Sequence, residues 1–163
     1  MAPTTPYSLD LGDREPIRSI RDSLGRVRAL TASWTPHDFE RSYAPGKWPA
    51  RKILTHLAQS EIAFGNRARM ALAAPARDYV AQPFDQDVWM AHESTLAGRE
   101  ALDALLGMAA MNVAFYGSLS AADRAVAFSH PEYGALTIDW LIHQSAGHLL
   151  HHLAQLETIA RAT

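Results

Sequence analysis

The residues best suited to chemistry in this chain are four histidines that lie within ten positions of one another: His143, His148, His151 and His152. Neutral imidazole nitrogens are common ligands of divalent metal ions. On a helix, His148 and His152 are four positions apart, so their Cβ atoms would lie about 5–6 Å apart. The spacing therefore predicts a pair that could bind one metal ion, provided that the segment is helical and faces the interior.

The segment around these histidines has the pattern of an amphipathic helix. At about 100° per residue, His152 falls within the broad apolar face and His148 falls at its edge. His151 points about 60° further out, and His143 points to the other side, toward solvent. His148 and His151 could also chelate a metal, but His151 lies well off the apolar face. We therefore favour His148 with His152, and expect His151 to support the site or to lie at the surface.

A site of this kind needs a third ligand from another part of the chain. His37 and His130 are expected in loops, and His92 comes before a helix, whereas His56 in "ILTHLAQSE" lies at the edge of an apolar helical face. Facing helices lie about 8–10 Å apart, a gap that inward imidazoles can span through a metal. His56 is thus the clearest third candidate. Polar decoration of the helices is the alternative interpretation of all three histidines.

Four amphipathic helices are expected to position these side chains. Pro36 and Pro75 follow the first and second helices, and Thr137 is a good N-cap for the fourth. Neither the helices nor the two long connections, 76–89 and 120–136, contain a run with the alternation of a β-strand. The pattern predicts an all-α four-helix bundle with long inter-helix connections. Its helices should cover about residues 17–34, 49–74, 96–119 and 138–160.

Length and composition indicate one globular domain. The 163 residues suit a single hydrophobic core, which we expect over residues 15–163 after a poorly ordered tail at 1–14. The net charge of −2 gives no basic field for nucleic acid. No signal-peptide pattern occurs, and no stretch approaches the roughly 18 apolar residues that span a membrane. We expect a cytoplasmic protein with no membrane or nucleic-acid partner.

Several familiar catalytic motifs are absent. The chain has no cysteine, which excludes disulfides, thiolate ligands and a cysteine nucleophile. His92-Glu93 begins like the metalloprotease motif HExxH, but Leu96 stands where its second histidine would be. No Glu-x-x-His pair of the kind found in di-iron bundles occurs, and no phosphate-binding glycine loop or nucleophile elbow is present.

Three stretches together resemble the DinB-like metal-binding four-helix bundles. They are "YAPGKWPARKILTHLAQSE" (43–61), "FDQDVW" (84–89) and "GALTIDWLIHQSAGHLLHHLAQLE" (134–157). The resemblance covers about residues 16–160. It implies a metal bound by His56, His148 and His152, usually zinc or nickel, with water in the remaining positions. It also implies a homodimer.

The resemblance further implies thiol-dependent chemistry, because family members of known activity include bacillithiol transferases and mycothiol-dependent isomerases. With three neutral histidines, a metal-bound water or thiolate would be the reactive group, and no side chain of the protein is assigned as nucleophile. We expect transfer of a low-molecular-weight cellular thiol to a small electrophilic substrate. The alternatives are a metal-dependent hydrolase and a non-catalytic, stress-related metal-binding bundle.

Other polar residues could hold the imidazoles in place. The candidates are Glu61, Gln155, Asp85 and Asp87, in addition to His151. Each has a simpler interpretation: an ion pair on its helix for Glu61, a helix-face hydrogen bond for Gln155, and solvated loop acids for the two aspartates.

Overall fold

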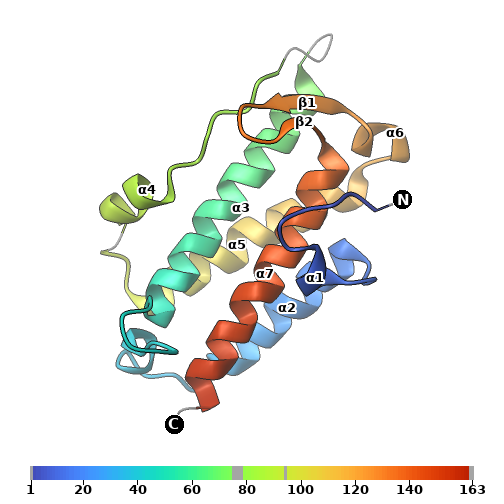
Figure 1. Cartoon of the computed structure of the whole chain (residues 1–163). Coiled ribbons are helices and arrows are strands. Elements are labelled where there is room, and N and C mark those ends of the chain that lie inside the picture. Colours follow the sequence, from blue (N-terminus) through green and yellow to red (C-terminus); the bar gives the residue numbers. More distant parts are fainter. Residues whose placement is uncertain (1, 75–78, 94, 162–163) are drawn as a thin grey trace.

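Four long helices form the body of the protein in the computed structural model, which describes residues 2–74, 79–93 and 95–161. Both α3 and α2 pack against α5 and α7, so each long helix has two neighbours around a shared core (Figure 1). The predicted all-α four-helix bundle is confirmed. The helices are α2 (Pro16–Leu30), α3 (Ala50–Ala73), α5 (Gly98–Ser118) and α7 (Ile138–Arg161).

Local capping explains where these helices begin and end. The Thr137 hydroxyl accepts from the Trp140 main-chain N–H at 3.2 Å, so the predicted N-cap of α7 is confirmed. Helix α2 ends at Leu30, before the predicted Trp34, and the Thr31 hydroxyl donates to the Val27 carbonyl at 2.9 Å in its last turn. Pro75, expected to close the second helix, lies outside the described residues.

The N-terminal segment packs on α7, unlike the poorly ordered tail that composition predicts. The short helix α1 (Ser8–Leu11) contacts α7, and its final leucine is buried. Gly147 permits this approach, because a Cβ atom there would lie only 2.5 Å from the main-chain oxygen of Tyr7. The Trp140 indole N–H also donates to the carbonyl of Thr4 at 2.9 Å. The docking rests on these contacts, which composition does not reveal.

The connection between α3 and α5 is only partly a loop. It contains α4 (Gln86–Glu93), which packs against α3, and the Gln59 amide donates to the last glutamate of α4 at 2.7 Å. Just before α4, the Ala81 N–H donates to the Ser129 carbonyl at 2.8 Å. These contacts hold the connection along the bundle. An earlier loop contains the short 3-10 helix η1 (Asp38–Glu40).

The connection between α5 and α7 contains an unpredicted hairpin as well as the short helix α6 (Ala121–Arg124). Strands β1 (Ala127–His130) and β2 (Gly134–Thr137) are antiparallel, with Phe128 opposite Leu136. Alternate residues share a face, and Phe128 and His130 are both buried. The expectation of no strands is wrong here, because strands of four residues are too short to show a clear alternation.

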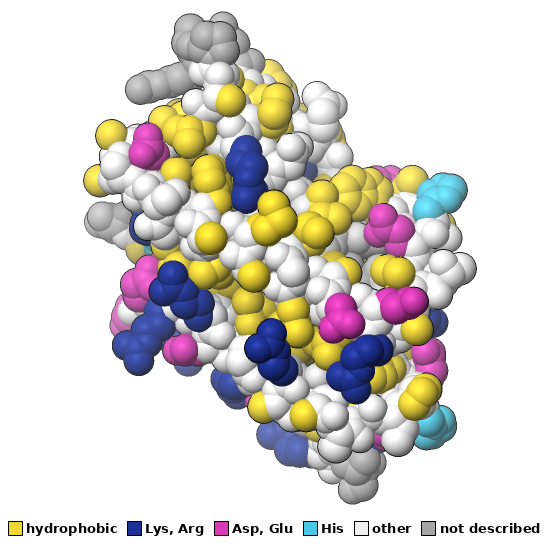
Figure 2. Space-filling model, turned by 180° about the vertical axis from the view of Figure 1, so that it is seen from behind, with side chains coloured by type: hydrophobic (Ala, Val, Ile, Leu, Met, Phe, Trp, Pro, Cys, Tyr) yellow, Lys and Arg dark blue, Asp and Glu magenta, His cyan; other side chains and the backbone are white. Residues whose placement is uncertain are grey.

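The face formed by α2 and α5 is seen in Figure 2 and carries apolar side chains between charged ones. A shallow apolar groove runs between these helices, with Arg21 and Arg28 among its lining residues. The expected homodimer stays a prediction. Within the described ranges, no helix combines the length and the apolarity needed to cross a membrane.

Replacing Gly147 by alanine should displace the N-terminal segment from α7. The new methyl group would collide with the Tyr7 main chain, so we expect a loss of about 1–3 kcal/mol in the free energy of unfolding. Urea denaturation and limited proteolysis before Pro16 would measure the change. Gly107→Ala is the control: nothing lies within 4 Å of its Cβ position, so it should stabilise α5 by about 0.5–1 kcal/mol. Unchanged stability and cleavage in Gly147→Ala would contradict the docking.

Candidate metal centre

Three histidines from two neighbouring helices meet inside the bundle. His56 comes from α3, and His148 and His152 come from α7, one turn apart. One ring nitrogen of each lies within 4.8 Å of the others, and the Nε2 atoms of His56 and His148 are 3.0 Å apart. The exposed fractions are 6%, 5% and 9% respectively. The structure therefore brings together the three residues that spacing and resemblance selected.

Burial keeps these imidazoles neutral. Desolvation lowers the pKa of His56 to about 4, and the pKa of His152 likewise falls to about 4. The pKa of His148 is well below its usual range, first because of burial and then because His152 and His56 lie beside it. The neutral imidazole is the form that binds a metal ion.

The geometry fits a divalent ion. Two nitrogens bound to one tetrahedral zinc ion, each at about 2.0–2.1 Å, would lie about 3.3 Å apart. The 3.0 Å separation between His56 and His148 is close to this value. The Nδ1 atom of His56 is buried and has no hydrogen-bond partner in the described part of the chain. The ring is thus held by packing, with Nε2 directed at His148.

Gln155, one of the candidate supporting residues, contacts the cluster. Its amide oxygen accepts a hydrogen bond from Nδ1 of His152 at 2.8 Å. With the proton on Nδ1, the Nε2 lone pair of His152 is free to face the other two rings. The amide nitrogen of Gln155 lies 3.4 Å from Nε2 of His151, so the same side chain contacts both histidines.

His151 lies beside the cluster and outside it. Among the residues described, the group of converging ligands contains His56, His148 and His152 only. Nδ1 of His151 instead lies 3.5 Å from a carboxylate oxygen of Asp10, and its ring packs against Tyr7. The structure therefore favours His148 with His152 over chelation by His148 and His151.

Aromatic rings surround His56. Trp48 meets it edge to face with ring centroids 5.4 Å apart, and Phe84 stacks on it at 6.3 Å. Among the described residues, no hydrogen bond joins Asp85 or Asp87, from the same segment as Phe84, to the three histidines. Asp85 caps α4 by accepting from two main-chain N–H groups, and Asp87 is exposed. The structure thus engages Asp85 at the start of α4 and leaves Asp87 exposed, so it does not bring them to the histidines.

Glu61 forms hydrogen bonds with side chains of the neighbouring helices α5 and α7. It is 3% exposed and accepts from the Ser145 hydroxyl at 2.6 Å and from the Asn112 amide at 2.8 Å. No hydrogen bond joins it to the three histidines in the described residues. Its carboxyl links α3, α7 and α5, so the structure engages it in holding these helices together.

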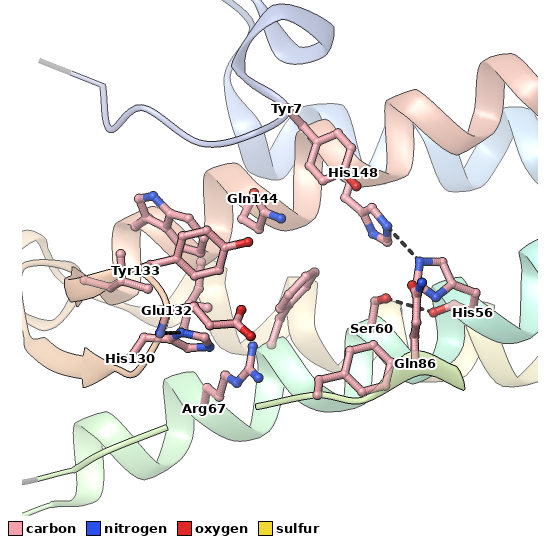
Figure 3. Close-up of a pocket in the computed structure, with 15 residues that line it drawn as sticks. Tyr7, His56, Ser60, Arg67, Gln86, His130, Glu132, Tyr133, Gln144 and His148 are labelled. Carbon is pink, nitrogen blue, oxygen red and sulfur yellow. Dashed lines mark hydrogen bonds between the residues drawn. The ribbon is translucent and has the colours of Figure 1, made fainter. Parts of the chain in front are cut away.

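A cavity of about 200 Å³ opens beside the histidines. His56 and His148 lie at one end, as Figure 3 shows, and Arg67, Glu132 and His130 lie at the other. Five apolar side chains also line the cavity: Phe64, Phe84, Leu136, Trp140 and Leu141. The cluster is thus accessible to a small molecule from the cavity side.

Sequence reasoning missed several residues of the cavity. Tyr7 packs against His148 with ring centroids 5.0 Å apart, and nothing in the N-terminal segment predicts this contact. Arg67 and Gln144 also line the cavity. Spacing could have found both: Arg67 follows His56 by three helical turns on one face, and Gln144 precedes His148 by four positions.

The fold and the site define a helical bundle with a buried three-histidine cluster at a cavity. The chain belongs to the DinB superfamily, whose sequence profile matches residues 19–156. The resemblance stated from the three sequence stretches is thereby confirmed.

Related proteins are similar over most of the chain. One protein of Oceanobacillus iheyensis is 26% identical, and the alignment covers 89% of this chain and 84% of that protein. A second protein of the same organism is 24% identical, over 86% of this chain and 81% of its own length. Both are named, as provisional assignments, metal-dependent hydrolases.

Solved structures share the fold. YfiT from Bacillus subtilis, described as a probable metal-dependent hydrolase with an unusual four-helix bundle topology, aligns with a TM-score of 0.80 at 18% identity. The alignment covers 99% of this chain and 91% of YfiT. A mycothiol-dependent maleylpyruvate isomerase aligns with a TM-score of 0.72 at 15% identity, over 94% of this chain and 63% of that protein.

Glu61→Gln should stabilise the metal-free protein increasingly as pH rises above about 4.5. Burial raises the pKa of the Glu61 carboxyl from its ordinary value of 4.5, so its stabilising contribution is present at low pH and is lost as pH rises through the raised pKa. Glutamine can still accept from Asn112 and donate to Ser145. Urea denaturation across this pH range would measure the difference.

Glu61→Ala is the comparison variant for this test. It leaves the Ser145 and Asn112 donors buried without their acceptor, so it should be less stable than Glu61→Gln by about 2–4 kcal/mol at every pH, because neither variant titrates at this position. A pH-independent difference between Glu61→Gln and wild type would show that the carboxyl does not titrate as this environment requires.

Proposed function

We propose that this protein is a metal-dependent hydrolase of small substrates, with zinc or nickel bound by His56, His148 and His152. The convergence of three buried, neutral imidazoles beside a cavity carries this proposal. The provisional names of the Oceanobacillus proteins and the description of YfiT support it.

The ligand set suits a catalytic site better than a structural one. Structural zinc sites have four protein ligands, whereas catalytic sites have three and an open position. No further histidine, aspartate or glutamate joins the three histidines among the described residues. When bound, a divalent ion supplies Lewis acidity and lowers the pKa of water at such an open position.

Neighbouring side chains orient the histidine rings and shield them from solvent. Gln155 fixes the tautomer of His152, and Trp48 and Phe84 shield one side of His56 from solvent. The Ser60 hydroxyl lines the cavity but donates to the His56 carbonyl at 2.9 Å, which ties it to the helix. With no cysteine in the chain, water is the nucleophile in this proposal.

Thiol transfer is the second candidate. The fold likeness to a mycothiol-dependent isomerase supports it. Because the chain has no cysteine, a small molecule would have to supply the thiol in this hypothesis. The cavity could admit either a thiol or a hydrolysable substrate. A non-catalytic metal-binding role is the remaining alternative, and activity assays separate it from the other two.

The purified, tag-free protein should bind about one divalent ion per chain, and His56→Ala or His148→Ala should abolish this stoichiometric binding. Metal content after dialysis with zinc or nickel, measured by mass spectrometry, tests this. His143→Ala is the matched control, because Nδ1 of His143 bonds to the Asp139 carbonyl away from the cluster. Full metal content in His56→Ala would exclude the three-histidine site.

Gln155→Leu should keep the fold and weaken metal binding by about 10–100-fold, because the proton on Nδ1 of His152 loses its acceptor. Competition with a chromophoric chelator would give the affinity. Wild-type affinity in the variant would show that the hydrogen bond does not tune the ligand.

Hydrolysis of small esters and amides by the metal-loaded protein should exceed that by the metal-free protein and by His56→Ala. The same preparations, given a model electrophile and a cellular thiol, test the second candidate. A metal-dependent rate only with thiol would replace hydrolysis by thiol transfer. No metal-dependent rate in either assay would leave the non-catalytic role.

A further inference from the structure

The end of the cavity far from the histidines carries a buried positive charge. Arg67 reaches it from α3 and is 8% exposed. One guanidinium nitrogen, Nη2, donates to the Gln82 carbonyl at 2.6 Å, which fixes the orientation of the group. Figure 3 shows the guanidinium at the opposite end of the cavity from His56 and His148.

This guanidinium has unused hydrogen-bonding capacity. An arginine offers five N–H donors, and the contact with Gln82 uses one nitrogen. In the described ranges no carboxylate lies within 4.0 Å of Arg67, although Glu132 is near enough to favour its charge. A buried arginine without a close anion is an unusual state, because burial of a charge is unfavourable without a partner.

A second polar group faces the same space. Gln144 lies one turn before His148 on α7, is 8% exposed, and points into the cavity in Figure 3. Its amide oxygen is buried and has no hydrogen-bond partner within the part of the chain that is described. Such an unpaired acceptor is satisfied when a ligand supplies an N–H or O–H group.

We propose that Arg67 binds the carboxylate of the substrate, that Gln144 accepts from an amide N–H or a hydroxyl beside that carboxylate, and that the reacting group lies at the histidines. The apolar side chains that line the cavity then cover the body of the substrate. The substrate class is therefore a small molecule that carries one carboxylate and an acyl group, as in an N-acyl amino acid. The placement of the reacting group at the histidines rests on the proposed function. Carboxylate binding by Arg67 does not depend on it.

The carboxylate of Glu132 opposes the binding of a ligand carboxylate at Arg67. It is exposed on the hairpin turn, while Arg67 is buried, so water screens Glu132 more strongly. A ligand carboxylate at Arg67 would still be repelled by it to some extent. Replacing Glu132 by glutamine should therefore strengthen carboxylate binding.

The test uses N-benzoylglycine and N-benzoylglycinamide as probes, which differ only in carboxylate against carboxamide. Calorimetric titration of the metal-free protein should give about 10–100-fold tighter binding of the carboxylate. The preference should vanish in Arg67→Gln and grow in Glu132→Gln. Arg51→Gln is the matched control, since it removes a charge from α3 at the ion pair with Glu40, outside the cavity, and should keep the preference.

Equal affinity for the two probes, no saturable binding of the carboxylate, or a preference that survives in folded Arg67→Gln would each overturn the proposal. Should Arg67→Gln not fold by circular dichroism, Gln144→Leu decides: binding of both probes should weaken while the carboxylate preference persists, and unchanged affinities would reject the site. Because no metal is present, these outcomes are separate from the metal and hydrolysis tests.

Discussion

The contact between α3 and α7 around three neutral imidazoles is the constraint on which the site depends. Burying such rings is unfavourable unless their nitrogens find partners. The close approach of His56 to His148 and the bond from His152 to Gln155 provide part of this compensation. A divalent ion would bind the ring nitrogens that converge, so this part of the bundle interior suits one.

The position of the cluster is tied to the core by a second set of polar contacts. Ser145 lies on α7, three residues before His148, and its hydroxyl donates to the carboxylate of Glu61 on α3. The same carboxylate accepts from the amide of Asn112 on α5. Gly65 leaves the space that the Asn112 side chain fills, since a Cβ atom there would lie 2.1 Å from its amide oxygen. Three helices are thus fixed relative to one another close to the histidines.

Helical periodicity predicted the four long helices and the pair His148 and His152, because i, i+4 spacing and a shared apolar face are local properties. The meeting of His56 with this pair is a tertiary contact, for which periodicity gave a candidate and the resemblance to the DinB-like bundles gave the assignment. Periodicity failed for the hairpin, whose strands are too short, and for Asp85, whose role follows from the start of α4. Glu61 lies on the same helix as His56, but only the tertiary structure shows that its carboxyl faces α5 and α7.

The cavity has a wall that does not belong to the bundle. Tyr7, held on α7 through Gly147, closes one side of the space beside His148. The shape of the site therefore depends on the first dozen residues, which an expression vector commonly alters. An affinity tag joined to this end, or a truncation that trims it, would change solvent access to the histidines while leaving all four long helices intact.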